Sequence, residues 1–378
     1  MISQGLVDAG APLMAEVETG VTWNRDGPKR QALEGVFEQL NIAAMCFSRP
    51  AEPYNSMISW LASGTDLIQP EDNETRLFLH DLPVVHEFDA AVVAKALGRR
   101  KAAIIEGHGV VTCGTVTMEQ CFVVFSSVLF SCFVKFFADL LQGAGKGRTS
   151  KAAIAAFEKV MHHLAPAQKI DVSLETGPFL SEAQVYGAIA EAGRLIVRNG
   201  LVDSVMGNIS YRFGDTLYIS QTGSFLDELE GCIDPCPLDN SACTGITAST
   251  ELPAHSRIVT ETPWRAVLHG HPKFAVIMSL ACEKTGCEFE GQCHTKCPEE
   301  RHVAGTPILP GESGVGPHAL CQRVPEALKT RQGVIVYGHG VFTAAAKDFN
   351  RPFRELVDIE TRSRELYFER LGNCGIRV

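Results

Sequence analysis

The sequence lacks the excess of basic residues that nucleic-acid-binding proteins usually carry. Its Lys and Arg residues number 34 against 44 Asp and Glu residues, which gives a formal net charge of −10. A surface of that charge repels phosphate backbones and anionic lipids, so the balance argues against nucleic-acid and membrane partners. An anionic substrate would have to be bound by a local device, such as backbone amides or a metal ion.

Two kinds of hydrophobic segment are also lacking. The first eight residues, Met1-Ile-Ser-Gln-Gly-Leu-Val-Asp, contain neither the basic region nor the apolar core of a signal peptide. The most apolar run, from Cys121 to Val134, is too short to span a bilayer. We therefore expect a cytoplasmic protein in which this run forms a buried or interface helix.

The cysteines cannot all be paired within one chain, because their number, 13, is odd. In the cytoplasm they are expected as free thiols or metal ligands rather than disulfides. Four fall within a short segment: Cys282, Cys287, Cys293 and Cys297. They could hold a second metal ion or an iron–sulfur cluster. Their spacing matches neither a tight zinc-knuckle pair nor a standard ferredoxin run, so free thiols or oxidised pairs remain the alternative.

Three histidines form the most informative pattern. His269 and His271 lie at the end of an apolar strand, where side chains two residues apart point to the same face. His339 follows in a second strand, within Gly338-His339-Gly340. Three neutral imidazoles leave a divalent ion with an open coordination position, which is typical of catalytic sites. Zinc is the default ion, and manganese, cobalt, nickel or iron would also be accepted.

Helices and strands alternate in both halves of the chain. In the second half we expect helices over 181–199, 250–262, 272–281, 319–328 and 350–371, and strands over 215–220, 266–271, 306–310 and 333–341. In the first half we expect helices over 29–40, 54–62, 88–97 and 117–142, and strands over 42–47, 76–79 and 102–111. The two orders are similar enough to predict an internal duplication.

Sequence echoes support the duplication. Glu106-Gly107-His108-Gly109-Val110 corresponds to Tyr337-Gly338-His339-Gly340-Val341, whereas Pro50-Ala51-Glu52-Pro53 stands where the second half has His269-Gly270-His271-Pro272. One imidazole does not hold a catalytic metal, so the first copy should be structural. We predict a truncated, degenerate copy over 1–145, a connector over 146–180 and a complete catalytic domain over 181–378.

On its motifs the second half resembles the class II aldolase/adducin family. Met206-Gly207-Asn208-Ile209-Ser210 matches the family's Gly-Asn-hydrophobic-Ser turn, and Gln221-Thr222-Gly223 matches its Thr/Ser-Gly turn. Ser249-Thr250-Glu251 matches its Ser-Ser-Glu segment, and the His-x-His and Gly-His-Gly elements match its metal ligands. The resemblance covers about residues 180–375, and more weakly 29–142.

The resemblance implies a duplicated α/β protein with three α/β/α layers and a mostly antiparallel central sheet. It implies a metal-dependent aldolase, a carbon–carbon lyase that acts on a small, phosphorylated ketose through a metal-stabilised enediolate. Glu251 matches the family's proton-transfer residue, although it would also suit the first turn of a helix. The matching phosphate-binding positions are Gly207, Asn208, Thr222, Gly223, Ser249 and Thr250.

The resemblance also bears on assembly and on alternative functions. Family members are commonly fourfold-symmetric tetramers, so a fused pair of units implies a homodimer with pseudo-fourfold symmetry. The enzymatic alternative is a sugar-phosphate dehydratase of the same family. The alternative of another class is a non-catalytic binding or sensor protein, because the adducin branch of the family has no enzyme activity.

Overall fold

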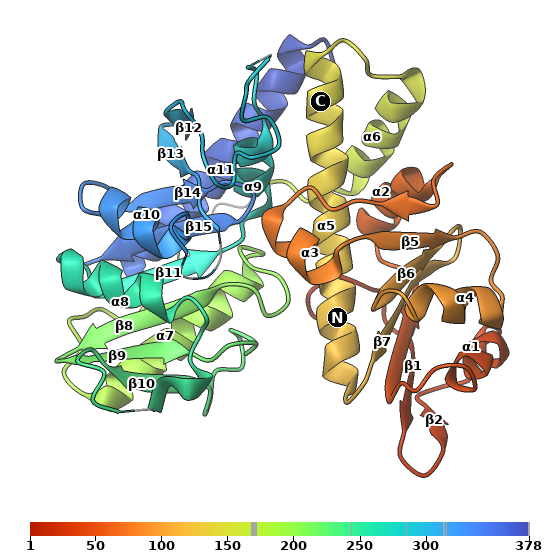
Figure 1. Ribbon diagram of the computed structural model, residues 1–378, viewed down its shortest axis with the longest axis horizontal. Coiled ribbons are helices and arrows are strands. Elements are labelled where there is room, and N and C mark those ends of the chain that lie inside the picture. Colours follow the sequence, from red (N-terminus) through yellow and green to blue (C-terminus); the bar gives the residue numbers. More distant parts are fainter. Residues whose placement is uncertain (168–171, 243, 285, 313, 315, 377–378) are drawn as a thin grey trace. The chain divides into compact units, whose positions relative to one another are not determined.

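The computed structural model describes residues 1–167, 172–242, 244–284, 286–312, 314 and 316–376. The chain forms two compact units, one of Met1–Pro166 joined by the C-terminal residues from Cys374, and one of Ala167–Asn373 (Figure 1). Residues 168–171, within the predicted connector, lie outside the described residues.

The second unit is built on an eight-stranded sheet in the order β10-β9-β8-β11-β15-β14-β13-β12. Its strands are β8 (Asn208–Phe213), β9 (Thr216–Ser220), β10 (Ile233–Pro237), β11 (Ala266–Gly270), β12 (Arg301–Val303), β13 (Thr306–Leu309), β14 (Gly333–Val336) and β15 (Gly340–Ala345). All neighbouring strands are antiparallel except β13 and β14. The predicted, mostly antiparallel sheet is therefore confirmed.

Helices cover both faces of this sheet. They are α7 (Glu182–Arg198), α8 (Leu252–Glu261), α9 (Lys273–Leu280), α10 (Leu320–Leu328) and α11 (Asn350–Asn373). Buried residues of α8 and α10 pack with Leu217, Val267 and Phe342 on one face. On the opposite face, Tyr186 of α7 contacts Tyr218, and α9 and α11 pack together. The predicted three α/β/α layers are confirmed.

The first unit is built on a seven-stranded sheet in the order β2-β1-β3-β7-β6-β5-β4. Its strands are β1 (Leu13–Val17), β2 (Val21–Trp23), β3 (Ala44–Ser48), β4 (Leu67–Ile68), β5 (Leu82–Val85), β6 (Ala102–Ile105) and β7 (Gly109–Gly114). Its helices are α1 (Arg30–Phe37), α2 (Tyr54–Ala62), α3 (Asn73–Leu79), α4 (Ala90–Leu97), α5 (Met118–Gly145) and α6 (Lys151–His163).

The two sheets have the same topology. Every strand pairing of the first sheet has a counterpart of the same direction in the second, including one parallel pair, β5–β6 against β13–β14. Among the described elements of the second unit, the helix α7, the edge strand β10 and the short 3-10 helix Thr244–Thr247 have no counterpart in the first. The duplication with a truncated first copy is thus present in the fold.

The strand register corrects the predicted alignment of the copies. Ser48 pairs with Val110 as Gly270 pairs with Val341, so the strand β3 is aligned with β11 three residues earlier than the sequence suggested. Phe47 and Arg49, rather than residues of the Pro50–Pro53 segment, take the places of the two strand histidines. In this register Pro50 coincides with Pro272, whereas the sequence alignment had matched Pro272 to Pro53, which also directly precedes a helix.

Three predicted strands are also wrong. Residues 76–79 belong to helix α3, because Asp72 caps the helix by accepting a hydrogen bond from the Thr75 amide at 2.7 Å. The strands predicted over 102–111 and 333–341 are each a hairpin, β6–β7 and β14–β15. Each breaks at a glycine, Gly107 or Gly338, with φ of +72° or +57°. Strands β1, β2, β4, β5, β8, β10 and β12 were not predicted.

The apolar helix of the first unit is longer than predicted. Among the described residues, α5 is the one helix whose length and hydropathy would suffice to cross a membrane, but 78% of its most apolar window is buried within the protein. Its Phe137 ring lies 6.5 Å from that of Phe157 on α6. We therefore interpret α5 as a core helix of the first unit, as the sequence led us to expect.

Candidate active site

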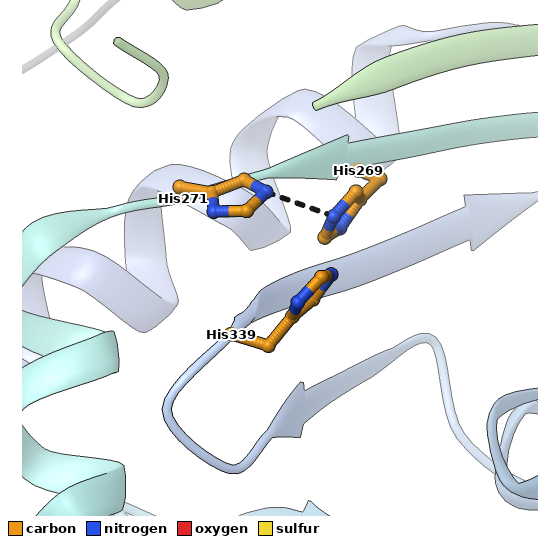
Figure 2. Close-up of side chains that lie close together, drawn as sticks. All are labelled: His269, His271 and His339. Atoms are coloured by element: carbon orange, nitrogen blue, oxygen red, sulfur yellow. Dashed lines mark hydrogen bonds between the residues drawn. The ribbon is translucent and has the colours of Figure 1, made fainter. Parts of the chain in front are cut away.

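The histidine triad of His269, His271 and His339 lies at one end of the second sheet. His269 is on β11, His271 directly follows that strand, and His339 lies in the turn between β14 and β15 (Figure 2). One ring nitrogen of each lies within 4.8 Å of the others, and the three side chains are at most 4% exposed. The predicted cluster is therefore formed, with His339 in a turn rather than in a strand.

Close backbone packing brings the three rings together. β11 pairs with β15 up to Gly270 and Val341, so the residues that follow and precede these strands meet at the same edge. A Cβ atom at Gly340 would lie 2.5 Å from the Gly270 carbonyl oxygen and 2.8 Å from Cε1 of His269. Only glycine fits at this position, which explains the Gly-His-Gly sequence.

Backbone contacts orient the ring of His269. Its Nδ1 lies 3.1 Å from the carbonyl oxygen of Val341, and a carbonyl can only accept, so Nδ1 carries the proton and Nε2 presents a lone pair. This Nε2 faces Nε2 of His271 at 3.0 Å. The ring also stacks on Phe342 with centroids 4.0 Å apart. A metal-binding histidine commonly has this arrangement, in which its second nitrogen is held by the protein.

Glu251 lies directly beside the histidine triad. Its Oε1 is 3.1 Å from Nε2 of His339, and its Oε2 is 3.4 Å from Nε2 of His269 and accepts a hydrogen bond from Asn208 at 2.9 Å. Burial raises the pKa of this carboxyl, but its interactions with His269, His339 and Asn208 together outweigh burial. The pKa therefore lies well below its usual range, and the carboxylate is ionised.

The residues of the triad fit a divalent cation. Three buried imidazole nitrogens in mutual contact range, with an ionised carboxylate beside them, are the donor set of an open metal site. In the described part of the chain, no other group of three or more His, Cys, Asp or Glu side chains is assembled so closely. The four cysteines of segment 282–297 are thus not preassembled as ligands.

The residues predicted to bind phosphate lie on three loops around the histidine triad and Glu251. Gly207 has φ of +78° and packs against the His269 carbonyl, and the buried Asn208 holds Glu251. Thr222 ties two of the loops together, because its hydroxyl accepts from the Thr250 amide and donates to the Ala248 carbonyl, each at 3.0 Å.

Exposure separates these loop residues into two groups. Thr222, Gly223 and Thr250 are exposed, whereas Ser249 is buried and its hydroxyl accepts a hydrogen bond from the Glu251 amide at 3.2 Å. Gly223 adopts a φ of +74°, which suits its position in a turn. Ser249 therefore orients Glu251, and the exposed residues are the ones that a substrate can reach.

Two functional contacts were missed by sequence reasoning. His255 and Ser210 are fully buried and hydrogen-bonded at 2.7 Å, which joins helix α8 to strand β8 behind Glu251. Burial lowers the pKa of His255 to about 3, so this ring is neutral. Its position four residues after Glu251 on a helix was the available signal. The Val341 carbonyl gave no signal at all, since it is a backbone atom.

Comparisons with known proteins identify a family for the second unit. Residues 187–365 match the family described as Class II Aldolase and Adducin N-terminal domain. A 3,4-dihydroxyphthalate decarboxylase from Arthrobacter keyseri is 27% identical over 199 residues, which cover 48% of this chain and 77% of that protein.

Two solved structures are also similar. The l-fuculose-1-phosphate aldolase from Thermus thermophilus has 24% sequence identity and a TM-score of 0.41, covering 51% of this chain and 97% of that one. A sugar-phosphate aldolase from Thermotoga maritima has 18% identity and a TM-score of 0.38, covering 50% of this chain and 96% of that one.

Proposed function

Because the second half of this chain belongs to the class II aldolase/adducin family, we propose that it is a metal-dependent carbon–carbon lyase. One observation carries the proposal, the contact of the ionised Glu251 carboxylate with the histidine triad. A proton-transfer group and a metal-binding group side by side are what carbon–carbon cleavage next to a carbonyl requires.

The protein's own residues have separate tasks in this reaction. A divalent cation at the triad would polarise a substrate carbonyl and stabilise the negative charge that develops as the bond breaks. Asn208 holds Oε2 of Glu251, and Ser249 accepts a hydrogen bond from its amide, so the carboxylate is fixed in position. Glu251 would accept a proton from a substrate hydroxyl and return a proton to the carbon that keeps the electron pair.

The first candidate reaction is aldol cleavage of a small phosphorylated ketose. The loops that carry Thr222, Gly223 and Thr250 are held against each other beside Glu251. Turn amides and hydroxyls can bind a phosphate without a basic surface, which suits a chain with a net charge of −10.

The second candidate is decarboxylation of a hydroxylated carboxylic acid. The similarity to 3,4-dihydroxyphthalate decarboxylase favours it, because that similarity covers 77% of that protein. The two reactions leave the electron pair on a carbon next to an oxygen-bearing carbon, and differ in whether an aldehyde or carbon dioxide departs. The same triad and the same Glu251 would serve in both.

The test is elemental analysis followed by product analysis. Full-length protein and a His269→Ala, His271→Ala variant are compared for divalent metal content, and both are then incubated with ketose phosphates and with dihydroxybenzoic and dihydroxyphthalic acids. We expect the variant to lose the triad's metal and all turnover. Triose phosphate and aldehyde as products would establish aldol cleavage, whereas carbon dioxide would establish decarboxylation. Metal content unchanged in the variant would overturn the proposal.

A further inference from the structure

The connection between α9 and β12, residues 281–300, is much longer than its equivalent in the first unit. There the corresponding connection, between α2 and β4, consists of residues 63–66 alone. Cys282, Cys287, Cys293 and Cys297 all lie in this extra segment, which we call the cysteine insert. The insert is therefore an addition to the unit that carries the histidine triad.

Hydrophobic burial does not stabilise the cysteine insert. None of its described residues is buried, and it forms neither helix nor strand there. Apart from the cysteines its apolar residues are Ala281 and Phe289, and Lys296 lies over the Phe289 ring at 4.6 Å. A segment with so little apolar surface cannot offset the entropy lost on ordering, so cross-links are the means of ordering it.

Its cysteines are available for such cross-links. Each of the four is a free thiol, with Cys282 exposed and the other three partly buried. Lys284, two residues after Cys282, forms an ion pair with Glu299, two residues after Cys297. The two ends of the insert are thereby held near each other, and four thiols of so short a segment can reach a shared ligand.

We propose that the cysteine insert binds one zinc ion through Cys282, Cys287, Cys293 and Cys297. As each zinc–sulfur bond forms, the thiol releases its proton to solvent, and the completed site carries a net charge of −2. Arg301, beside Cys293, offsets part of that charge, and Lys296 lies in the same segment. The sulfurs are not preassembled because ligation supplies the free energy that orders such a loop.

The insert is anchored next to the histidine triad. Arg301 donates to the carbonyls of Ser279 and Ala281, at 2.8 and 2.5 Å, and so closes the two ends of the insert. The hydroxyl of Ser279 accepts a hydrogen bond from the amide of Gly338 at 2.8 Å, one residue before His339. A zinc ion in the insert would thereby fix the ends of the segment that supports the turn of the third histidine.

Zinc stoichiometry tests the proposal on the full-length protein, purified without oxygen. The variants are Cys293→Ser with Cys297→Ser, His269→Ala with His271→Ala, His294→Ala, and the control Cys374→Ser, which changes an exposed cysteine outside the insert. We expect the double cysteine variant to lose one zinc ion per chain and His294→Ala and Cys374→Ser to lose none. The double histidine variant should keep the insert's zinc.

Spectroscopy keeps the test valid if the cysteine variant fails to fold. The zinc that remains in the double histidine variant should show sulfur ligands alone, at about 2.3 Å by X-ray absorption. Cobalt in its place should give sulfur-to-metal charge-transfer absorption. Nitrogen ligands, unchanged zinc in the cysteine variant, or iron with acid-labile sulfide would overturn the proposal. An empty histidine triad would refute only the proposed function.

Discussion

Of the glycines around the histidine triad, Gly340 has the least space for a side chain. It lies where β15 begins, between the Gly270 carbonyl and the rings of two ligands. The geometry of the metal site therefore depends on a residue without a side chain as much as on the histidines themselves.

We expect Gly340→Ala to weaken metal binding about 10–100-fold, because the added methyl group would displace His269 and His271. Gly187, in helix α7, has nothing within 4 Å of its Cβ position, and Gly187→Ala is the matched control. That control should bind metal normally and be more stable by about 0.5–1 kcal/mol. Metal titration measures the affinity of both variants for the ion, and equal affinities would contradict the expectation.

We expect Glu251 to transfer protons and not to be required for metal binding. We expect Glu251→Gln to keep its metal and to lose turnover about 10²–10⁴-fold, because glutamine preserves the shape but cannot transfer the proton. Asn208→Ala should lower turnover less, since the carboxylate remains but loses the hydrogen bond that fixes Oε2. Metal content and rate are measured together; a Glu251→Gln protein with wild-type turnover would exclude the assigned role.

Asp72 gives the first unit a pH-dependent stability. Burial raises the pKa of its carboxyl from 3.8 to about 6, so the folded state holds the proton more tightly than the unfolded state. Its contribution to stability is present below pH 3.8 and is lost as the pH rises to about 6.

We therefore expect Asp72→Asn, which keeps a helix cap on α3, to remove this loss and to stabilise the protein near pH 7 by up to about 3 kcal/mol. Urea unfolding at several pH values between 4 and 7.5 measures the effect. A difference between wild type and variant that does not change across this range would contradict it.

At the scale of elements, helix α8 positions the Glu251 carboxylate. Glu251 immediately precedes the first turn of this helix. His255 is hydrogen-bonded to Ser210 on β8, the strand that pairs with β11, and β11 carries His269. This hydrogen bond joins the helix to the sheet one turn away from Glu251.

We expect His255→Ala to destabilise the second unit by about 2–4 kcal/mol, because it removes a buried ring and a hydrogen bond. Ser210→Ala should cost about 1–3 kcal/mol, since it leaves a buried ring nitrogen without its partner. The double variant should cost less than the sum of the two. Thermal unfolding of the three proteins measures this coupling, and strict additivity would show that the contact contributes nothing.

Elements with an internal period could be predicted, and those defined by contacts could not. The helices over 54–62 and 319–328 follow from their apolar spacing, and the pair His269 and His271 from strand alternation. Strands β1 and β10 span five residues each, and β10 contains two prolines, so their pairing partners define them rather than their sequence. Likewise the triad's residues could be named, whereas the contacts of Glu251 with Asn208 and Ser249 required the fold.

At the scale of the whole molecule, one topology carries two different sets of residues. The register places Phe47, Arg49 and Leu13 where the second unit has His269, His271 and Asn208. Lys29 precedes helix α1 as Glu251 precedes α8. At the corresponding positions the first unit has one imidazole, that of His108, and a base where the second unit has an acid.

The shared register makes a prediction about metal content. We expect Phe47→His with Arg49→His to create a three-imidazole group with His108, so that the chain binds one more divalent ion than the wild type. Its affinity should be lower than that of the natural triad, because no carboxylate corresponds to Glu251. Metal titration measures it, and His108→Ala in the same background is the control. A folded variant with wild-type stoichiometry would show that the two sites are not equivalent.

The connection between β2 and α1 spans residues 24–29, whereas the corresponding stretch from β9 to α8 spans 221–251 and contains Ser249, Thr250 and Glu251. Point substitutions can exchange ligands within the first sheet, but they cannot supply a missing stretch of chain. To become catalytic, the first copy would need an insertion of the right length at one place, which is a far rarer genetic event than a point substitution. We therefore expect this half of the chain to tolerate substitutions wherever packing allows.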